Sequence, residues 1–307
     1  MVTQPDRGRG RGRKQSPSPV GQRALSAGVP LLRSDRVGDG ETVETLKSLQ
    51  PDLGVVVAFG QFIPKQVRTL PRLGYLINGH ASLLPRYRGA SPIAQAILDG
   101  QEHTGVSVMR VEREMDAGPV AVARPVKIGT TETTGELTLR LSELAAELLL
   151  EAVESIAEKT IRWTEQDHTL ASVAPKISRT DGRIDWCQNT AECVRRVNAM
   201  APKPGAFTPL AEADAGELKI LRASACPETA EKNSAQPPRP GDLRLADHDG
   251  APPLRIRTAD GWLVPLEVQR SGGKVMEPAA FLRGYPLAEG NLLGRTASRE
   301  DEKGEQA

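Results

Sequence analysis

The sequence predicts an α/β domain built on a parallel sheet, followed by a small, mostly antiparallel β-domain. Apolar runs of strand length alternate with helical patterns up to about residue 160, which is typical of a parallel sheet. Beyond residue 200, short β-like runs are separated by Pro- and Gly-rich turns, as in a small barrel. The chain has 307 residues, about twice the usual size of a single domain, so two domains are expected.

The composition excludes several classes of protein. Lys and Arg number 40 against 39 Asp and Glu, so the net charge of +1 is unlike that of a histone-like polycation. With 38% hydrophobic residues, the chain can bury a core and is not a disordered protein. No apolar run approaches the roughly 18 residues of a membrane span, and no signal peptide opens the chain. We therefore expect a cytoplasmic protein without membrane contact.

The three cysteines, Cys187, Cys193 and Cys226, are too few and too widely spaced for a disulfide framework. No histidine stands at ligand spacing from them, so we expect no metal site. They are interpreted as ordinary small core or surface residues.

The first 20 residues differ from the rest of the chain. Glycines alternate with basic residues and are followed by Ser16-Pro17-Ser18-Pro19. Because Gly spacers and Pro breakers exclude a helix or a central strand, this segment is expected to be a mobile basic loop or tail. The basic residues of the segment are Arg7, Arg9, Arg11, Arg13 and Lys14.

The first half of the α/β region predicts one helix and two strands. Residues 42–50 form a short helical pattern. Residues 53–59 are a continuous apolar run, as expected for a parallel strand buried on both faces. Residues 73–80 predict a second strand whose last residues turn polar.

The second half predicts two helices and two more strands. Ser91 and Pro92 are typical of a helix start, and Gly100 of its end. Strands are expected over residues 105–111 and 120–126. Thr133 and Glu136 form a capping box ahead of a long helix. Its apolar face is predicted to consist of Leu137, Leu141, Leu144, Leu148 and Ile156.

The pattern changes after residue 165. A polar, turn-prone stretch is interpreted as a linker, a helix is expected near residues 190–199, and the β-like runs are residues 218–222, 242–245, 254–257 and 263–268. The charged last residues are typical of a frayed end. The predicted domains are residues 1–165 (catalytic), 166–182 (linker), 183–297 (barrel) and 298–307 (flexible tail).

The candidate chemistry lies in residues 76–92. Asn78 and His80 are two apart at the end of a predicted strand, so their side chains point to the same side. Ligands of parallel α/β proteins bind beyond the carboxyl ends of the strands. An amide and an imidazole there can stabilise an oxyanion and move a proton. Asp116, in a polar break between two predicted strands, could fix the tautomer of the imidazole. No Ser or Cys nucleophile accompanies them, which favours direct transfer over covalent catalysis.

Each of these residues also has a plainer interpretation. An Asn-x-His pair at a strand end is more often a hydrogen-bonded turn pair, and Asp116 before Ala-Gly-Pro is most simply a turn former. His103, His168 and His248 stand in polar contexts and are interpreted as solvated.

Longer motifs carry a resemblance to a known family. Asn78-Gly79-His80 followed by residues 82–89, SLLPRYRG, resembles the signature of the folate-dependent formyltransferases. Further segments are similar to the members of that family that act on methionyl-tRNA. They are VTQPD at 2–6, GRGRK at 10–14, VVAFGQFIP at 56–64, DAGP at 116–119, APKIS at 174–178, RIDW at 183–186 and PGAF at 204–207.

The resemblance implies a fold and an activity. The fold is a Rossmann-like formyltransferase domain joined to an OB-like β-barrel that binds tRNA. The reaction is attack of the methionyl α-amine of initiator methionyl-tRNA on the formyl carbon of 10-formyltetrahydrofolate, the formyl-donor co-substrate. The enzyme is expected to act as a monomer without a metal.

The resemblance also implies residue roles. Asn78, His80 and Asp116 match the catalytic trio, in which Asn78 and His80 stabilise the oxyanion while Asp116 orients His80 and assists proton transfer. Ser82, Leu83, Leu84 and Pro85 match the folate-contacting segment. Arg9, Arg11, Arg13 and Lys14 match the loop that enters at the acceptor end of the tRNA.

The sequence departs from the family pattern in two places. The family normally has a strand and a helix, roughly 30 residues, before the strand in which Met1 lies here. We therefore expect either a true start further upstream or a truncated, impaired form. Gly79 replaces the usual apolar residue between Asn and His.

Two other interpretations stay open. One is a different folate formyltransferase, acting on a glycinamide ribonucleotide or an amino-sugar nucleotide. The other is a protein that only binds RNA, through its basic arm and barrel.

Overall fold

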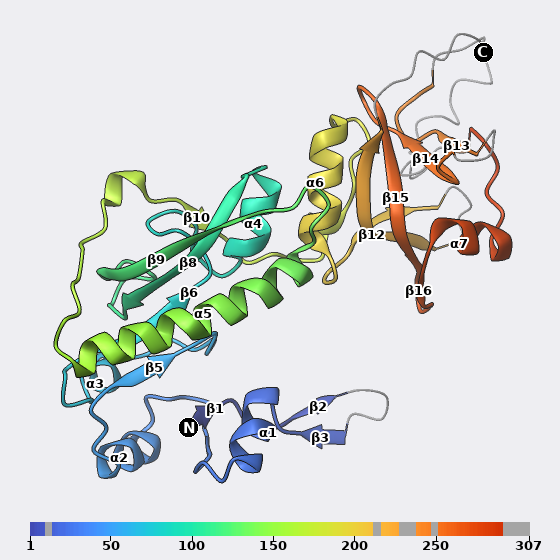
Figure 1. The fold of residues 1–307 in the computed structure, drawn as a ribbon. Coiled ribbons are helices and arrows are strands. Elements are labelled where there is room, and N and C mark those ends of the chain that lie inside the picture. The colour runs from blue at the N-terminus through green and yellow to red at the C-terminus, as the bar shows by residue number, and fades with distance from the viewer. Residues whose placement is uncertain (10–13, 211–215, 227–237, 247–250, 291–307) are drawn as a thin grey trace, which may run out of the picture. The chain divides into compact units, whose positions relative to one another are not determined.

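Two compact units make up the fold in Figure 1. The structure is a computed structural model that describes residues 1–9, 14–210, 216–226, 238–246 and 251–290. The first unit comprises residues 1–88, 106–124 and 144–172. The second comprises residues 89–105 and 125–143 and the chain from residue 173 onward. The predicted domain boundaries stay a prediction.

A four-stranded sheet carries the candidate site. Its strands are β5 (Gly54–Val56), β6 (Leu76–His80), β8 (His103–Arg110) and β9 (Val120–Lys127), in that spatial order. β5 and β6 are parallel, whereas β8 runs antiparallel to β6. β1 (Val2–Thr3) and β4 (Leu32–Arg33) form a separate parallel pair. The predicted α/β class with parallel strand pairs is confirmed.

The prediction that residues 53–59 are buried on both faces is wrong. Regular pairing covers only Gly54–Val56, and Val55 and Val57 are 50% and 55% exposed. Among the described residues, β5 pairs only with β6. The described part of the chain does not cover the face to which Val55 and Val57 point. The apolar run is therefore not buried on both faces.

The basic N-terminal segment contains structure that the sequence did not predict. β2 (Arg7–Arg9) and β3 (Lys14–Ser16) pair as an antiparallel hairpin, and residues 10–13 between them lie outside the described residues. A two-stranded hairpin has no central strand, so the Gly spacers do not prevent it. The next helix, α1 (Pro19–Ser26), begins with Pro at its first turn and is capped by Ser18, whose Oγ accepts from the Gly21 N–H at 3.0 Å.

Two further helices of the α/β region, α2 (Gly40–Ser48) and α4 (Pro92–Leu98), were predicted from the sequence, whereas α3 (Lys65–Arg68) was not. α2 is capped by Asp39, α3 is a single turn, and α4 follows Ser91. Ser91 Oγ does not cap α4 but accepts from the N–H of Ile177 at 3.3 Å. Short elements complete the region: β7 (Arg88–Gly89), the 3-10 helix η1 (His168–Leu170), β10 (Val173–Ala174) and the 3-10 helix η2 (Thr180–Gly182).

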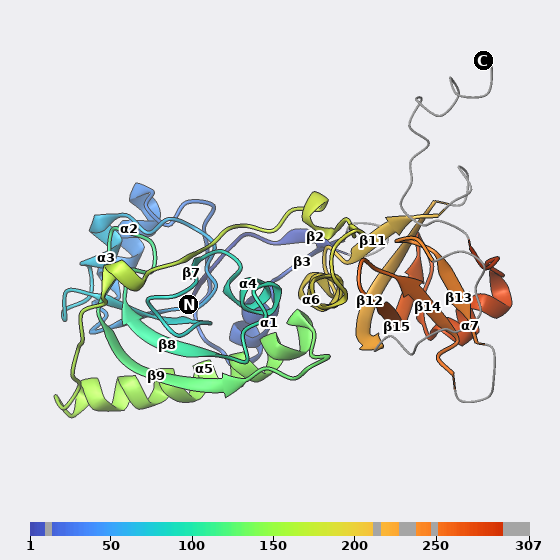
Figure 2. The same cartoon turned by 90° about the horizontal axis from the view of Figure 1, so that it is seen from above.

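The long helix α5 (Thr134–Ala157) starts at the predicted capping box. The Thr133 N–H donates to Glu136 Oε2 at 3.0 Å, and the Glu136 N–H donates to Thr133 Oγ1 at 3.3 Å. Leu137, Leu141, Leu144 and Leu148 are buried as predicted, and Ile156 is half-buried. In Figure 2, α5 runs alongside β8 and β9.

The C-terminal part of the chain forms one antiparallel sheet. Its order is β11 (Ala206–Pro209), β12 (Glu217–Cys226), β15 (Trp262–Arg270), β14 (Leu254–Arg257) and β13 (Leu243–Leu245), and β16 (Val275–Met276) also pairs with β15. The helices α6 (Thr190–Met200) and α7 (Pro278–Gly284) pack against it. The predicted C-terminal β-domain is therefore confirmed.

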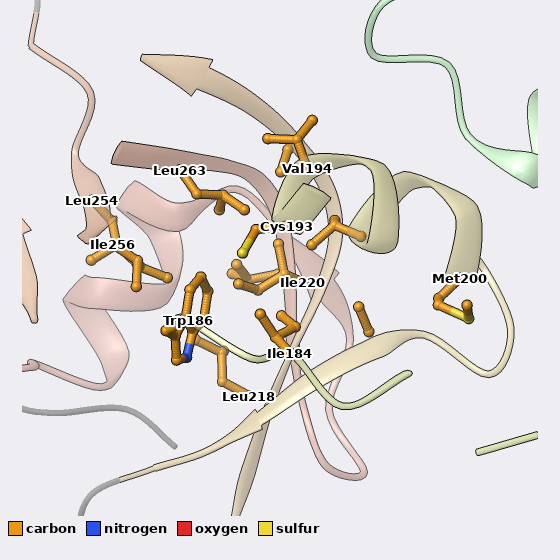
Figure 3. Packing of buried hydrophobic residues seen from close by; sticks show 14 of the residues in the cluster. Ile184, Trp186, Cys193, Val194, Met200, Leu218, Ile220, Leu254, Ile256 and Leu263 are labelled. Atoms are coloured by element: carbon orange, nitrogen blue, oxygen red, sulfur yellow. The ribbon is translucent and has the colours of Figure 1, made fainter. Parts of the chain in front are cut away.

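The core of this sheet domain surrounds Trp186 and Cys193 (Figure 3). The indole N–H of Trp186 donates to Thr208 Oγ1 at 3.1 Å, so its one polar atom is satisfied in the core. Burial raises the pKa of the Cys193 thiol to about 12. Such a thiol stays protonated at neutral pH, in line with the prediction of an ordinary core cysteine.

Glu136 links the start of α5 to the C-terminal sheet. Its carboxylate bonds Arg222 on β12 as well as Thr133, and these contacts hold the pKa of Glu136 below its ordinary value of 4.5. A lowered folded-state pKa contributes stability that is present above the unfolded-state pKa and is lost as pH falls through the folded-state value.

We therefore expect Glu136→Gln to lower the free energy of unfolding at pH 7 by about 0.5–1 kcal/mol, since the pair is partly exposed. Urea melts of both proteins at pH 7 and pH 4 would test this, and the difference should shrink at the lower pH. A difference that is equal at both pH values would mean that the ion pair contributes nothing.

Among the described residues, the helices include none that is both long and apolar enough to cross a membrane.

Candidate active site

The end of β6 presents Asn78 and His80 on one face of the sheet. Gly79, between them, faces α5: a side chain there would begin 3.2 Å from Leu149 Cδ1. Because side chains alternate along a strand, Asn78 and His80 point away from α5. The glycine lets α5 lie close to the sheet. The side-chain amide of Asn78, half-buried, makes no hydrogen bond to the described part of the chain.

The structure brings Asp116 to His80, as predicted. His80 Nδ1 lies 3.5 Å from Asp116 Oδ2, and the two side chains are only 7% and 15% exposed. The other ring nitrogen, Nε2, lies 2.8 Å from the carbonyl oxygen of Tyr87. Both nitrogens of the buried ring therefore contact groups of the protein.

These contacts determine where the protons of His80 lie. A carbonyl oxygen can only accept, so Nε2 carries a proton and donates it to Tyr87. In the neutral ring, Nδ1 would then point a lone pair at the Asp116 carboxylate. A proton taken up between Nδ1 and Oδ2 converts this contact into a charge-assisted hydrogen bond.

Asp116 stands on a tight turn between β8 and β9. Its φ is +52°, in the left-handed region that few residues other than glycine adopt. Two residues on, a side chain at Gly118 would collide with the carbonyl oxygen of Arg110. The Arg110 N–H donates to the Pro119 oxygen at 3.0 Å and closes the turn. The turn that the plainer interpretation expected is thus present, and it carries the carboxylate to His80.

The segment matched to folate contact is held by hydroxyl groups. Ser82 is fully buried, and its hydroxyl donates to the Arg86 carbonyl at 2.6 Å. Leu83, Leu84 and Pro85 are half-buried. Ser107 on β8, opposite His80 in the ladder, donates to the Ser82 oxygen at 2.8 Å and accepts from the Leu84 N–H at 3.1 Å. No signal in the sequence marks Ser107, which looks like any buried strand residue.

Sequence reasoning also missed Gln166. Gln166 is only 7% exposed, and both atoms of its side-chain amide make hydrogen bonds. Its Nε2 donates to the carbonyls of Asp116 and Gly118 at 2.9 and 2.7 Å, and its Oε1 accepts from Arg88 Nε and Nη2 at 3.1 and 2.7 Å. His168, interpreted as solvated, is exposed, and its Nδ1 also lies 3.3 Å from Arg88.

Two of the four basic residues matched to tRNA binding lie on the described strands of the N-terminal hairpin. Arg9 ends β2 and Lys14 begins β3, and the two are paired across the hairpin. Arg11 and Arg13 lie outside the described residues. All three members of the trio, by contrast, are described: His80 contacts Asp116, and Asn78 lies two residues before His80 on β6.

Two family models match the chain in order. The model described as formyl transferase matches residues 1–153, and the one described as formyl transferase, C-terminal domain, matches residues 176–286. The chain is 39% identical over 295 residues to the methionyl-tRNA formyltransferase of Citrifermentans bemidjiense, covering 96% of this chain and 88% of that protein. It is 40% identical over 294 residues to that of Roseiflexus castenholzii, covering 96% and 90%.

Solved structures share the fold at low identity. HypX from Aquifex aeolicus in complex with tetrahydrofolic acid matches with a TM-score of 0.60 and 20% identity, over 89% of this chain and 48% of that chain. WlaRD, a sugar 3N-formyl transferase, matches with a TM-score of 0.58 and 16% identity, over 83% and 82%. Likeness at this level of identity concerns the fold alone.

Proposed function

The chain belongs to the formyl transferase family, and from this membership we propose how its residues act. Like the relatives that it matches along almost its whole length, it is a methionyl-tRNA formyltransferase. It transfers a formyl group to the α-amino group of methionine on initiator tRNA. Its co-substrate is a folate, which we propose to be 10-formyltetrahydrofolate.

One observation carries this function. The identity of 39–40% extends over 96% of the chain and includes the C-terminal domain. The test is to incubate the purified protein with 10-formyltetrahydrofolate and methionyl-tRNA and to follow formyl-methionyl-tRNA on an acid gel. An amino-sugar nucleotide and uncharged tRNA serve as parallel substrates. Formylation of the sugar nucleotide alone, or tRNA binding without formylation, would exclude this function.

The reaction makes one bond and breaks another. The amine nitrogen attacks the formyl carbon, whose oxygen becomes an oxyanion. The amine then loses a proton, the bond from carbon to the folate nitrogen breaks, and that nitrogen takes up a proton. Stabilising the oxyanion and moving the proton are therefore the two tasks of the protein.

We propose that the side-chain amide of Asn78 stabilises the oxyanion. Its amide has two N–H donors that the described protein does not use, and it lies at the carboxyl end of a strand, where α/β proteins bind ligands. His80 was matched to the same task. However, its Nε2 proton is directed to Tyr87 and its Nδ1 faces Asp116, which supports a different role.

We propose that the pair of His80 and Asp116 accepts the proton that the amine loses. The amine proton passes to the gap between Nδ1 and Oδ2, directly or through a water molecule, and from there to the leaving folate nitrogen. The 3.5 Å separation and low exposure of the two side chains support this role. Because the site is screened from solvent, the charge that develops on the imidazolium interacts strongly with the carboxylate.

The half-buried Leu83, Leu84 and Pro85 are proposed to contact the folate. They offer apolar surface, while the hydroxyl of Ser82 is used within the protein. Ser82 is therefore proposed to shape this segment rather than to bind folate through its side chain.

The hairpin is proposed to contact the acceptor stem of the tRNA. Replacing Arg9, Arg11, Arg13 and Lys14 together by Gln should weaken tRNA binding. It should also flatten the plot of log K against log salt by up to about 0.9 for each phosphate that the hairpin no longer neutralises. Filter binding of methionyl-tRNA over a series of salt concentrations measures both quantities. If affinity and slope are unchanged, the hairpin does not contact the tRNA.

A further inference from the structure

Five residues of the site are linked in a closed ring of contacts. His80 donates to the Tyr87 carbonyl, and Arg88, next in the chain, donates to Gln166. Gln166 donates to the carbonyl of Asp116, whose carboxylate returns to His80. The residues come from three parts of the sequence, so the ring joins the segment after β6, the turn after β8 and the segment that follows α5.

Within this ring, Gln166 clamps the turn that carries Asp116. Its two N–H groups reach the carbonyls on either side of Ala117, at 2.9 and 2.7 Å. The turn needs such support because Asp116 has a left-handed backbone, which costs free energy for a residue with a side chain. A shift of this turn would carry the carboxylate away from His80.

Arg88 fixes the orientation of the Gln166 amide. A guanidinium only donates and carbonyls only accept. If the amide were flipped, its N–H groups would face the Arg88 guanidinium and its oxygen would face the carbonyls of the turn, so neither hydrogen bond could form. Arg88 is itself held by its backbone, whose N–H donates to the Ser172 oxygen at 2.9 Å. The clamp therefore has one stable arrangement.

We propose that Gln166 is a positioning residue for the transfer, with Arg88 as its support. It holds Asp116 where the carboxylate can share a proton with His80, and it contacts neither substrate. The inference rests on the proposed function of the His80 and Asp116 pair. In such sites, small displacements of a proton-transferring group lower the turnover more than they lower binding.

The first test is kinetic, with Gln166→Leu and Gln166→Glu compared with the wild type. Both variants lose the two donors to the turn, and Gln166→Glu keeps an acceptor for Arg88. We expect kcat to fall about 10–100-fold while KM for methionyl-tRNA and for the folate stays within about twofold. The matched control is Gln66→Leu, which removes an exposed amide that donates to the Gly38 carbonyl at 2.8 Å.

A second readout does not depend on turnover. The chain has four histidines, so ring nitrogen NMR signals of His80 can be assigned with a His80→Ala sample. We expect Gln166→Leu, or Gln166→Glu if the first variant does not fold, to shift these signals in the same way as Asp116→Asn. Gln66→Leu should leave them in place. If the wild type does not formylate, the spectra still report whether Gln166 holds Asp116.

Two results would overturn the inference. One is a kcat within twofold of the wild type in both Gln166 variants. The other is a folded Gln166 variant whose His80 signals match those of the wild type.

Discussion

His80→Ala and Asp116→Ala should each lower kcat for methionyl-tRNA formylation by about 10²–10⁴-fold, the range of general acid–base catalysis. In the structure the two side chains contact each other at 3.5 Å and are nearly buried, so neither can be replaced by bulk water. Removing Asp116 leaves His80 without its carboxylate partner, and removing His80 leaves the carboxylate without the ring. Single-turnover rates at saturating folate and tRNA measure the loss.

The double variant makes this test sharper. Because the two groups are proposed to act on one proton, the loss in His80→Ala/Asp116→Ala should be close to the larger of the two single losses. Losses that multiply would mean that the residues act separately. His103→Ala, at an exposed position where β8 begins, is the control and should keep full activity. Affinity for methionyl-tRNA, measured by filter binding, should stay within about threefold in all variants, since none of the replaced residues is among the proposed phosphate contacts.

Much of the fold could be predicted from local patterns. The capping box at Thr133 and Glu136 has its effect within four residues, and the leucines of α5 repeat at helical spacing. The burial of β5, by contrast, could not be predicted from such a local pattern. The run VVV at 55–57 has the composition of a buried strand, but burial depends on what covers the strand, and Val55 and Val57 are half exposed. The hairpin of β2 and β3 was missed because this segment is rich in Gly and Pro, which have low strand propensity.

Part of the candidate site could also be predicted from local patterns. Asn78 and His80 could be placed on one face of a strand from their spacing alone. Asp116 could be singled out as a candidate partner of His80 because it stands in a polar break between two predicted strands. Ser107 and Gln166 could not be found, because each acts through contacts with backbone groups that lie 23 to 50 residues away in the sequence. Gln166 lies in a polar segment that was interpreted as the start of a linker, where a glutamine has no apparent task. The role proposed for His80 also needed the structure, since the Tyr87 carbonyl, which can only accept, indicates which ring nitrogen holds the proton.

Asn78→Ala should lower kcat by about 10²–10³-fold, the usual cost of losing one oxyanion donor, with little change in either KM. Asn78→Asp should have a lower kcat than Asn78→Ala, although it preserves the size of the side chain, because a carboxylate would face the developing negative charge.

The control is Asn189→Ala, which removes the cap of α6, where the side chain accepts from the Glu192 N–H at 2.8 Å. It should lower the melting temperature and leave kcat unchanged, the opposite pattern to Asn78→Ala. If Asn78→Asp transfers formyl groups as fast as the wild type, the oxyanion is not stabilised by this amide. The donor would then have to be found elsewhere at the end of β6.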